Sequence, residues 1–266
     1  MLILLPPSEG KTPAASGDPV DPAALWLPEL TTARKRVLAR LVALCKRTSA
    51  RSVAESLRTL GLTDGQRSEI LRNGTLMGAP AAPAAEVYTG VLYEALDAAS
   101  LAPPARAWLD ESVVVFSGLW GVVRMDDRIP AYRCAIGSAL AAPVGGLTAY
   151  WKRALKAPLD RVTGDRPVLD LRSGVYAAMW TPPAATSASV RVLHERTAGG
   201  ETQRSVVSHF NKATKGRIVR ALAEAGTAPA SVDEMVSALR DLKLTVEEQA
   251  AVPGRPRQID VVVTDL

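Results

Sequence analysis

The first segment that groups side chains able to bind an anion lies near the N-terminus. In Pro6-Pro7-Ser8-Glu9-Gly10-Lys11-Thr12, a hydroxyl and an ammonium group directly follow an apolar run. The GxxxxGK spacing of a phosphate loop is missing, because a single glycine precedes Lys11. Ser8, Lys11 and the backbone N–H groups can still bind an anion at the end of a strand. An ordinary turn is the alternative interpretation.

A second segment places arginines beside a tryptophan. The stretch SGLWGVVR contains Trp120 and ends at Arg124, and Asp127, Tyr132 and Arg133 follow it. The two guanidinium groups offer planar forks that suit phosphate or carboxylate oxygens, and Asp127 can orient one of them. Trp120 and Tyr132 are rings close to these arginines in sequence, and either can stack on a nucleobase. A structural Arg–Asp pair is the alternative interpretation.

A third segment carries a pair of lysines at helical spacing. Lys212 and Lys215 lie three residues apart between Ser208 and Arg217, so on a helix the two ammonium groups are neighbours. Like charges at this spacing repel each other unless an anion lies between them, which favours an anion site with Ser208 and Arg217 nearby. His209 has no visible Asp or Ser partner for a catalytic triad, so a hydrogen-bonded structural histidine is the simpler interpretation.

Positive charge is concentrated in one stretch of the chain. The 266 residues carry a net charge of +5 at pH 7. Residues 31–75 alone have a net charge of +7, from three acidic and ten basic side chains. The basic ones are Arg34, Lys35, Arg36, Arg40, Lys46, Arg47, Arg51, Arg58, Arg67 and Arg72. Such a field favours DNA, double-stranded or distorted, or a phosphorylated small molecule as partner. A solvated arginine face is the alternative interpretation.

Composition and motifs exclude several familiar sites. The chain has two Cys and two His and contains no HExxH, CxxC, GxGxxG or GxSxG motif. We therefore predict no metal centre, no disulfide framework and no cofactor. No apolar stretch approaches the roughly 18–20 residues that a membrane span needs, so no membrane partner is expected. A cytoplasmic protein with reduced thiols is expected.

These segments need a scaffold that brings strand ends together. Apolar runs that alternate with helices predict an α/β fold, bordering on α+β, in which a mixed sheet is flanked by helices and polar residues follow the strands. The expected strands are Leu2–Leu5, Val113–Phe116, Val168–Leu171, Val190–Leu193, residues 206–207 and Ile259–Val263. The expected helices cover residues 32–47, 51–60, 66–72, 88–99, 147–157, 212–225 and 231–241, with a loop at 79–85. We expect one compact domain over residues 1–266, with a helical insertion at 31–75 after the first strand.

Taken in order, six motifs resemble those of the YaaA family of bacterial peroxide-stress proteins. They are the opening MLILLPPSEGKT, VYTG at residues 87–90, SGLWGVVR with the Asp, Tyr and Arg that follow it, Tyr150-Trp151, LxSxxY with Ser173 and Tyr176, and SxxxKxxKG at residues 208–216. The C-terminal stretch 226–266 resembles the family poorly.

The resemblance implies a single compact α/β fold with a positively charged cleft. It also implies a helix–hairpin–helix-like element, a DNA-binding motif whose hairpin N–H groups meet the phosphate backbone. Arg51–Leu60, a hairpin at Gly61 and Gln66–Arg72 match that element, and its cationic residues are Arg51, Arg58, Arg67 and Arg72. The family is associated with protection from hydrogen peroxide, with limiting free iron and DNA damage, and with DNA binding.

Two functional hypotheses follow. In the first, a cytoplasmic stress protein binds DNA largely through phosphate contacts from the insertion and the Lys212/Lys215 pair, so that binding weakens with salt. In the second, an enzyme acts on a small anionic or nucleotide-like ligand in one pocket. That pocket would be lined by Ser8, Lys11, Arg124, Arg133, Ser173, Lys212 and Lys215. Convergence of this set on one deep pocket favours the second hypothesis, and a shallow groove continuous with Arg47–Arg72 favours the first.

Overall fold

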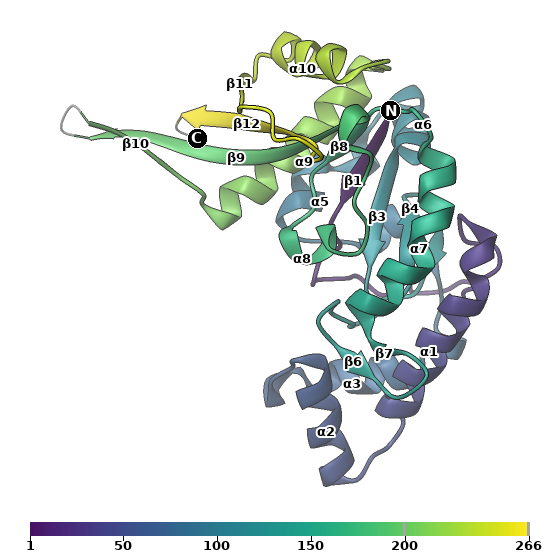
Figure 1. Ribbon diagram of the computed structural model, residues 1–266. Coiled ribbons are helices and arrows are strands. Elements are labelled where there is room, and N and C mark those ends of the chain that lie inside the picture. The colour runs from purple at the N-terminus through teal and green to yellow at the C-terminus, as the bar shows by residue number, and fades with distance from the viewer. Residues whose placement is uncertain (199–200, 265–266) are drawn as a thin grey trace.

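The protein is built on one mixed sheet, seen in the computed structural model of Figure 1. The structure describes residues 1–198 and 201–264. Neighbouring strands follow the order β11 (Thr245–Glu248), β12 (Arg257–Thr264), β9 (Ser187–Ala198), β8 (Val168–Asp170), β1 (Leu2–Leu5), β3 (Val113–Ser117) and β4 (Gly121–Arg124), and β10 (Glu201–Ser205) pairs with β9. Strands β12, β9, β8, β1 and β3 are parallel, and β11, β10 and β4 pair antiparallel. The predicted α/β fold with a mixed sheet is confirmed.

Strand β1 lies in the middle of this sheet. It pairs in parallel with β3 on one side and with β8 on the other, so that Ile3 lies opposite both Val113 and Leu169. Every residue of β1 and β3 is buried. A strand covered on both faces needs apolar side chains at successive positions, which explains the continuous apolar runs in the sequence.

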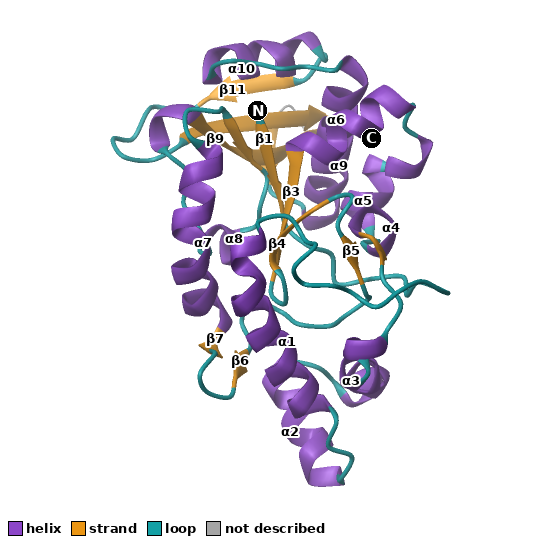
Figure 2. Ribbon diagram, turned by 90° about the vertical axis from the view of Figure 1, so that its right-hand side faces the viewer, coloured by secondary structure: helices purple, strands orange, loops and turns teal. Residues whose placement is uncertain are grey.

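Helices cover both faces of the sheet (Figure 2). α7 (Leu147–Thr163) lies on one face, and α5 (Val91–Leu96), α6 (Pro103–Ser112) and α9 (Ser208–Ala225) lie on the other. α10 (Val232–Asp241) packs beside β11 and α9. Within the described part of the chain, no helix is both long and apolar enough to cross a bilayer.

The helical insertion follows β1 and lies at one end of the molecule (Figure 1). It consists of α1 (Thr31–Cys45), α2 (Ala50–Leu60) and α3 (Arg67–Gly74), which pack on one another. The remaining short elements are the pairs β2 (Ala82–Pro83) with β5 (Arg128–Ile129) and β6 (Ala139–Leu140) with β7 (Gly145–Gly146), the turns α4 (Ala84–Val87) and α8 (Gly174–Ala177), and 3-10 turns at Pro28–Leu30, Asp64–Gln66, Leu76–Gly78, Ala98–Ser100 and Ala184–Thr186.

Several boundaries differ from the prediction. α5 is shorter than the helix expected at 88–99. A helix absent from the prediction, α6, begins at Pro103, because proline suits the first turn. Residues 206–207 follow β10 and are not a strand. The stretch 79–85 holds β2 and the start of α4 as well as a loop. The prediction omits β4 and β11, which pair antiparallel at the two ends of the strand order.

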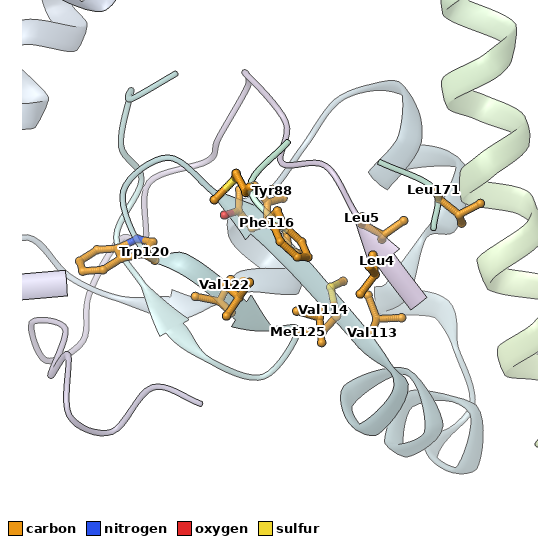
Figure 3. Packing of buried hydrophobic residues seen from close by; sticks show 14 of the residues in the cluster. Leu4, Leu5, Tyr88, Val113, Val114, Phe116, Trp120, Val122, Met125 and Leu171 are labelled. Carbon is orange, nitrogen blue, oxygen red and sulfur yellow. The ribbon is translucent and has the colours of Figure 1, made fainter. Parts of the chain in front are cut away.

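Aliphatic side chains and a few rings fill the core (Figure 3). Leu4 and Leu5 of β1 pack near Val114 and Phe116 of β3, and all four are at most 1% exposed. Trp120, in the turn between β3 and β4, is also fully buried. Tyr132 is 1% exposed. Neither ring can therefore stack on a nucleobase, which corrects that expectation.

One arginine of the basic stretch belongs to the core. Arg34 of α1 is fully buried, and burial lowers its pKa to about 10. Its guanidinium donates hydrogen bonds to the carbonyl oxygens of Leu25, Trp26, Leu27, Trp120 and Val122. These bonds tie the loop before α1 to the β3–β4 hairpin. The guanidinium of Arg34 therefore stabilises the fold and is not available to a partner at the surface.

Helix α9 packs closely against α5 because Gly216 has no side chain. A Cβ atom at this position would lie 2.1 Å from the carbonyl oxygen of Leu92 and 2.9 Å from the backbone nitrogen of Leu96. Both atoms are backbone and cannot move without shifting α5. The glycine thus sets the distance between the helices and the position of Lys212 and Lys215, which lie on the same helix.

Gly216→Ala is expected to lower the free energy of unfolding by about 2 kcal/mol, because the added methyl group overpacks the α5–α9 contact. Urea denaturation measures this change. Gly78→Ala is the matched control, because a Cβ atom there meets nothing within 4 Å, and it should change stability by less than about 0.5 kcal/mol. Alanine favours helix over glycine by about 1 kcal/mol, so a more stable Gly216→Ala variant would contradict the close contact.

Candidate functional site

A cavity of about 750 Å³ opens where β1 and β8 end, and we call it the strand-end cavity. Its wall comes from the segment after β1, residues 89–93, residues 132–135, residues 171–176, and parts of β9 and α9. Parallel strands end at the same edge of a sheet, which brings these distant segments together. The sequence-predicted residues that line the cavity are Ser8, Lys11, Tyr132, Arg133, Ser173, Tyr176, Lys212 and Lys215.

The turn after β1 is closed by its own polar groups. The Ser8 hydroxyl donates to the carbonyl oxygen of Gly10 and accepts from the backbone N–H of Thr89 at 3.2 Å. Lys11 Nζ donates to the carbonyl oxygen of Ser8 at 2.6 Å. Lys11 also forms an isolated antiparallel bridge with Tyr88. The segment is therefore a fixed turn, and it places Lys11 among the residues that line the cavity.

Two tyrosine rings flank the Lys11 amine. Nζ lies 4.3 Å from the centre of the Tyr132 ring and 5.3 Å from that of the Tyr88 ring. Burial, together with the positive charge of Arg133, lowers the pKa of Lys11 to about 7. Cys134, Glu69 and Glu9 oppose the shift. The amine is therefore divided between its charged and neutral forms near neutral pH.

A chain of hydroxyl groups lies beneath these rings. Tyr88 OH and Tyr132 OH are 3.0 Å apart, and Tyr132 OH is 2.6 Å from Ser117 Oγ. Ser117 Oγ in turn accepts from the backbone N–H groups of Leu119 and Trp120. Burial raises the pKa of both tyrosines well above the ordinary value. Both phenols are therefore neutral, and the chain fixes the rings that face Lys11.

Arg133 is held on the cavity wall from two directions. Its guanidinium contacts Glu9 Oε2 at 2.8 Å, and this hydrogen bond lowers the pKa of Glu9. Its backbone is paired with the Asn73 side chain of α3, which accepts from Arg133 N at 3.0 Å and donates to Arg133 O at 2.7 Å. The insertion therefore positions one residue of the cavity, although it contributes no lining residue from 47–72 within the described chain.

The two lysines of α9 have different environments. Lys212 is exposed and lines the cavity, close enough to lower the pKa of Glu9. Lys215 is 8% exposed, and its Nζ donates to the carbonyl oxygen of Leu171 at 3.0 Å. Burial lowers the pKa of Lys215. Lys212 is thus the member of the pair that is free to meet a ligand, while Lys215 anchors α9 to the segment after β8.

Ser173 and Tyr176 lie on the turn that follows β8. Ser173 is exposed at the N-terminus of α8, where its side chain makes no capping hydrogen bond. Tyr176 is partly buried, and burial raises its pKa to about 12. The two side chains therefore offer the cavity a hydroxyl group and an aromatic wall.

The sequence analysis missed two arginines on the cavity wall. Arg172 is buried, forms an ion pair with Asp170 at 2.6 Å, and lies over the Phe116 ring at 4.1 Å. Arg191 on β9 is half exposed and makes two hydrogen bonds to Asp260 of β12, at 2.9 and 2.5 Å. The alternation Val-Arg-Val at 190–192 is the signal that indicates an outward arginine on a strand.

Arg124 and Asp127 do not form the predicted anion site. The Arg124 guanidinium lies over the Trp26 ring, 4.9 Å from its centre, and does not line the cavity. Asp127 accepts from the backbone N–H groups of Trp26 and Arg124 at 2.9 and 2.8 Å. It therefore fixes a backbone turn and orients no guanidinium. Trp120 does not line the cavity, but its ring makes an edge contact with the Tyr132 ring, which does.

The cationic residues of the insertion lie outside the cavity. Arg51 and Arg58 are exposed on α2. Arg67 forms an ion pair with Asp64 at 3.0 Å, and Arg72 forms one with Glu69 at 2.7 Å. On α9, Arg217 is exposed and outside the cavity lining, and the predicted Ser208 side chain lies outside the described residues.

The described residues also bear on metal binding. Across residues 1–198 and 201–264, no group of three or more His, Cys, Asp and Glu side chains is placed to hold an ion. Cys45 and Cys134 are both free and buried, and burial raises the pKa of Cys134 to about 12. Their thiols are therefore protonated and unreactive at neutral pH.

Lys11 is expected to titrate near pH 7, about three units below an exposed lysine. Trace labelling with acetic anhydride at a series of pH values, followed by peptide mapping, measures the pKa of each amine. Lys152, exposed on α7, is the internal control for the reactivity of an exposed amine. A Lys11 labelled with the same pH dependence as an ordinary exposed lysine would contradict the environment described for its amine.

Comparison with known proteins gives the family. The chain matches the family described as peroxide stress protein YaaA over residues 1–250. It is 51% identical to a UPF0246 protein of Streptomyces coelicolor over 270 residues, which covers all of both chains. A UPF0246 protein of Corynebacterium efficiens is 37% identical, with 99% of this chain and 100% of the relative covered. An uncharacterized protein of Campylobacter jejuni is 28% identical, with 81% and 82% covered.

The family match also corrects the expectation for the C-terminal stretch. It runs to residue 250, and the Streptomyces relative aligns over the whole chain, so the resemblance extends well past residue 226. The protein belongs to the YaaA family of peroxide stress proteins.

Proposed function

We propose that this member of the peroxide-stress family binds a phosphate-bearing, nucleotide-like ligand in the strand-end cavity. The observation that carries the proposal is the convergence of Lys11, Arg191 and Lys212 on one cavity from the turn after β1, from β9 and from α9. Six of the seven residues predicted to line one pocket, all but Arg124, line this cavity, and such convergence favours a small anionic ligand. The free thiols of Cys45 and Cys134 are compatible with a reducing compartment, and we propose the cytoplasm as the location.

The charge of the cavity supports an anionic ligand. Glu9 is the acidic residue of its lining, against six cationic ones: Lys11, Arg133, Arg172, Arg191, Lys212 and Lys215. The three arginines each have a carboxylate partner, whereas none of the three lysines forms an ion pair within the described chain. Lysine ammonium groups without carboxylate partners on a cavity wall attract phosphate oxygens.

The size and the aromatic lining support a nucleotide-like ligand. A volume of about 750 Å³ lies within the range of small-molecule sites, which is about 300–1,000 Å³. Tyr176, which is partly buried, lines the cavity together with the lysines, and the buried rings of Tyr93 and Tyr132 belong to the same wall. A ligand with a phosphate at one end and a planar ring at the other matches both parts of this wall.

A nucleoside monophosphate is expected to bind at least about tenfold more tightly than the nucleoside that lacks the phosphate. Lys212→Ala should remove most of this difference, because one charge-assisted hydrogen bond contributes about 1.5–3 kcal/mol and about 1.4 kcal/mol corresponds to tenfold in affinity. Isothermal titration calorimetry with deoxyadenosine monophosphate and deoxyadenosine measures both effects. Lys152→Ala on α7 is the control and should leave both affinities unchanged. Equal affinity for the two compounds would refute the proposal.

Exposed arginines of the insertion support a second function, DNA binding at a separate surface. Arg51 and Arg58 on α2 are exposed and form no ion pair within the described residues. Arg40 and Arg47 line a second cavity of about 520 Å³ between α1, α2 and the turn after β6. These side chains lie where a duplex could contact the insertion without entering the strand-end cavity.

The backbone N–H groups of the turn between α2 and α3 already have hydrogen-bond acceptors. Gly61 adopts the left-handed conformation at the end of α2, and its N–H points to the Arg58 carbonyl oxygen at 3.3 Å. The N–H of Leu62 donates to Leu57 O at 2.8 Å, and that of Thr63 donates to Gln66 Oε1 at 3.1 Å. Phosphate contacts from this element would therefore come from arginine side chains and not from these backbone groups.

Arg51→Ala combined with Arg58→Ala is expected to weaken binding to duplex DNA and to lower the slope of log affinity against log salt by about 2, one unit for each lost phosphate contact. Fluorescence anisotropy across a salt series measures the slope. Lys152→Ala is again the control. A slope that the double variant leaves unchanged would mean that α2 does not contact DNA.

A further inference from the structure

The Lys11 amine has surroundings that suit covalent chemistry as well as binding. We propose that Lys11 forms a reversible imine with the carbonyl group of a phosphate-bearing aldehyde or ketone in the strand-end cavity. The inference rests on the proposed function, because the same cavity must first hold the phosphate. It goes beyond that function by assigning a nucleophile and a second functional group on the ligand.

The first argument is the position of the amine. Lys11 lines the cavity just after β1, and the one hydrogen bond of its Nζ among the described residues goes to the Ser8 carbonyl oxygen. A carbonyl acceptor fixes the direction of the amine without supplying a negative charge. A carboxylate partner, by contrast, would keep the amine protonated. The turn therefore aims the amine and leaves it free to lose its proton.

The second argument is the protonation state. The groups that act on Lys11 are Arg133, Cys134, Glu9 on the cavity side and Glu69 of α3, and burial together with Arg133 outweighs the carboxylates. With a pKa of about 7, roughly half of the amine is neutral at pH 7. An exposed lysine is neutral in roughly one molecule in a few thousand at that pH. A neutral amine is the nucleophile that attacks a carbonyl carbon.

The third argument is the pair of rings that flank Nζ. The faces of Tyr132 and Tyr88 lie 4.3 and 5.3 Å from the amine, at distances where an aromatic face attracts a cation. An iminium ion at the same place carries the same charge and is more weakly hydrated. The rings are held in place by the hydroxyl chain to Ser117, so they can stabilise the iminium without rearrangement.

The reaction balances without any further reagent. The lone pair of the neutral Lys11 amine forms a bond to the carbonyl carbon, and a proton passes from nitrogen to the carbonyl oxygen to give a carbinolamine. Protonation and loss of that hydroxyl as water give the iminium ion, and addition of water reverses each step. No electron is transferred between molecules, so no oxidant or reductant is needed.

The remaining lining residues define the ligand class. Lys212 and Arg191 lie on the same cavity wall as Lys11 but come from α9 and β9. They would hold the phosphate while Lys11 reaches the carbonyl carbon. A short-chain aldehyde phosphate and the open-chain sugar of an abasic nucleotide share this chemistry, a carbonyl group and a phosphate in one small anion.

Imine trapping tests the proposal. The protein is incubated with glycolaldehyde phosphate and sodium cyanoborohydride, which reduces an iminium ion to a stable secondary amine, and the product is analysed by intact mass and peptide mapping. We expect one adduct, at Lys11, which forms at least about tenfold faster than at exposed Lys35 or Lys152. Its rate should rise with pH through about 7, and unphosphorylated glycolaldehyde should label Lys11 much more slowly.

Lys11→Arg is the matched variant, because it keeps a cation beside the rings and removes the nucleophile. It should lose the adduct while circular dichroism shows the native fold.

The same trapping with an abasic oligonucleotide in place of glycolaldehyde phosphate distinguishes a free aldehyde phosphate from an abasic sugar within DNA. Labelling spread evenly over exposed lysines would overturn the proposal even if nucleoside monophosphate binding is measured. Absence of both adduct and nucleotide binding would overturn the proposed function as well.

Discussion

The parallel pairing of β1 with β3 and β8 is the constraint on which the rest of the structure depends. It buries β1 on all sides, so the strand must be apolar throughout, and the first polar residues of the chain can appear only after Leu5. The same pairing brings the segments after β1 and β8 to one edge of the sheet, where they line the strand-end cavity. Core and site therefore follow from one arrangement of strands.

The Lys11 amine is held at this edge against a desolvation cost. Burying an ammonium ion is unfavourable unless a partner compensates, and the structure supplies two tyrosine faces and one carbonyl oxygen in place of a carboxylate. The insertion takes part as well, because Asn73 holds the Arg133 backbone and Glu69 acts on the Lys11 pKa. The helices that carry the surface arginines therefore also contact residues of the cavity wall. Through these contacts the candidate DNA-binding surface and the candidate ligand site share one structural element.

Much of the fold could be predicted from the sequence, and the site could be predicted in part. Buried parallel strands such as Leu2–Leu5 leave continuous apolar runs, so the prediction matches β1 residue for residue. Antiparallel β4 and β11 are short and lack such a run. Ser8, Lys11 and Lys212 were found because they follow strands or share a helix face. Arg34 and Arg124 were predicted to be available to an anionic partner, but carbonyl groups surround Arg34 and the Trp26 ring covers Arg124. Sequence spacing does not indicate which groups will surround a guanidinium.

A crystal structure of the protein with a bound nucleoside monophosphate tests the central claim most directly. The account predicts the phosphate in the strand-end cavity, within hydrogen-bonding distance of Lys212, with the base against the partly buried Tyr176 ring. A nucleotide bound only beside Arg51 and Arg58 of the insertion, with the strand-end cavity filled by water, would contradict it.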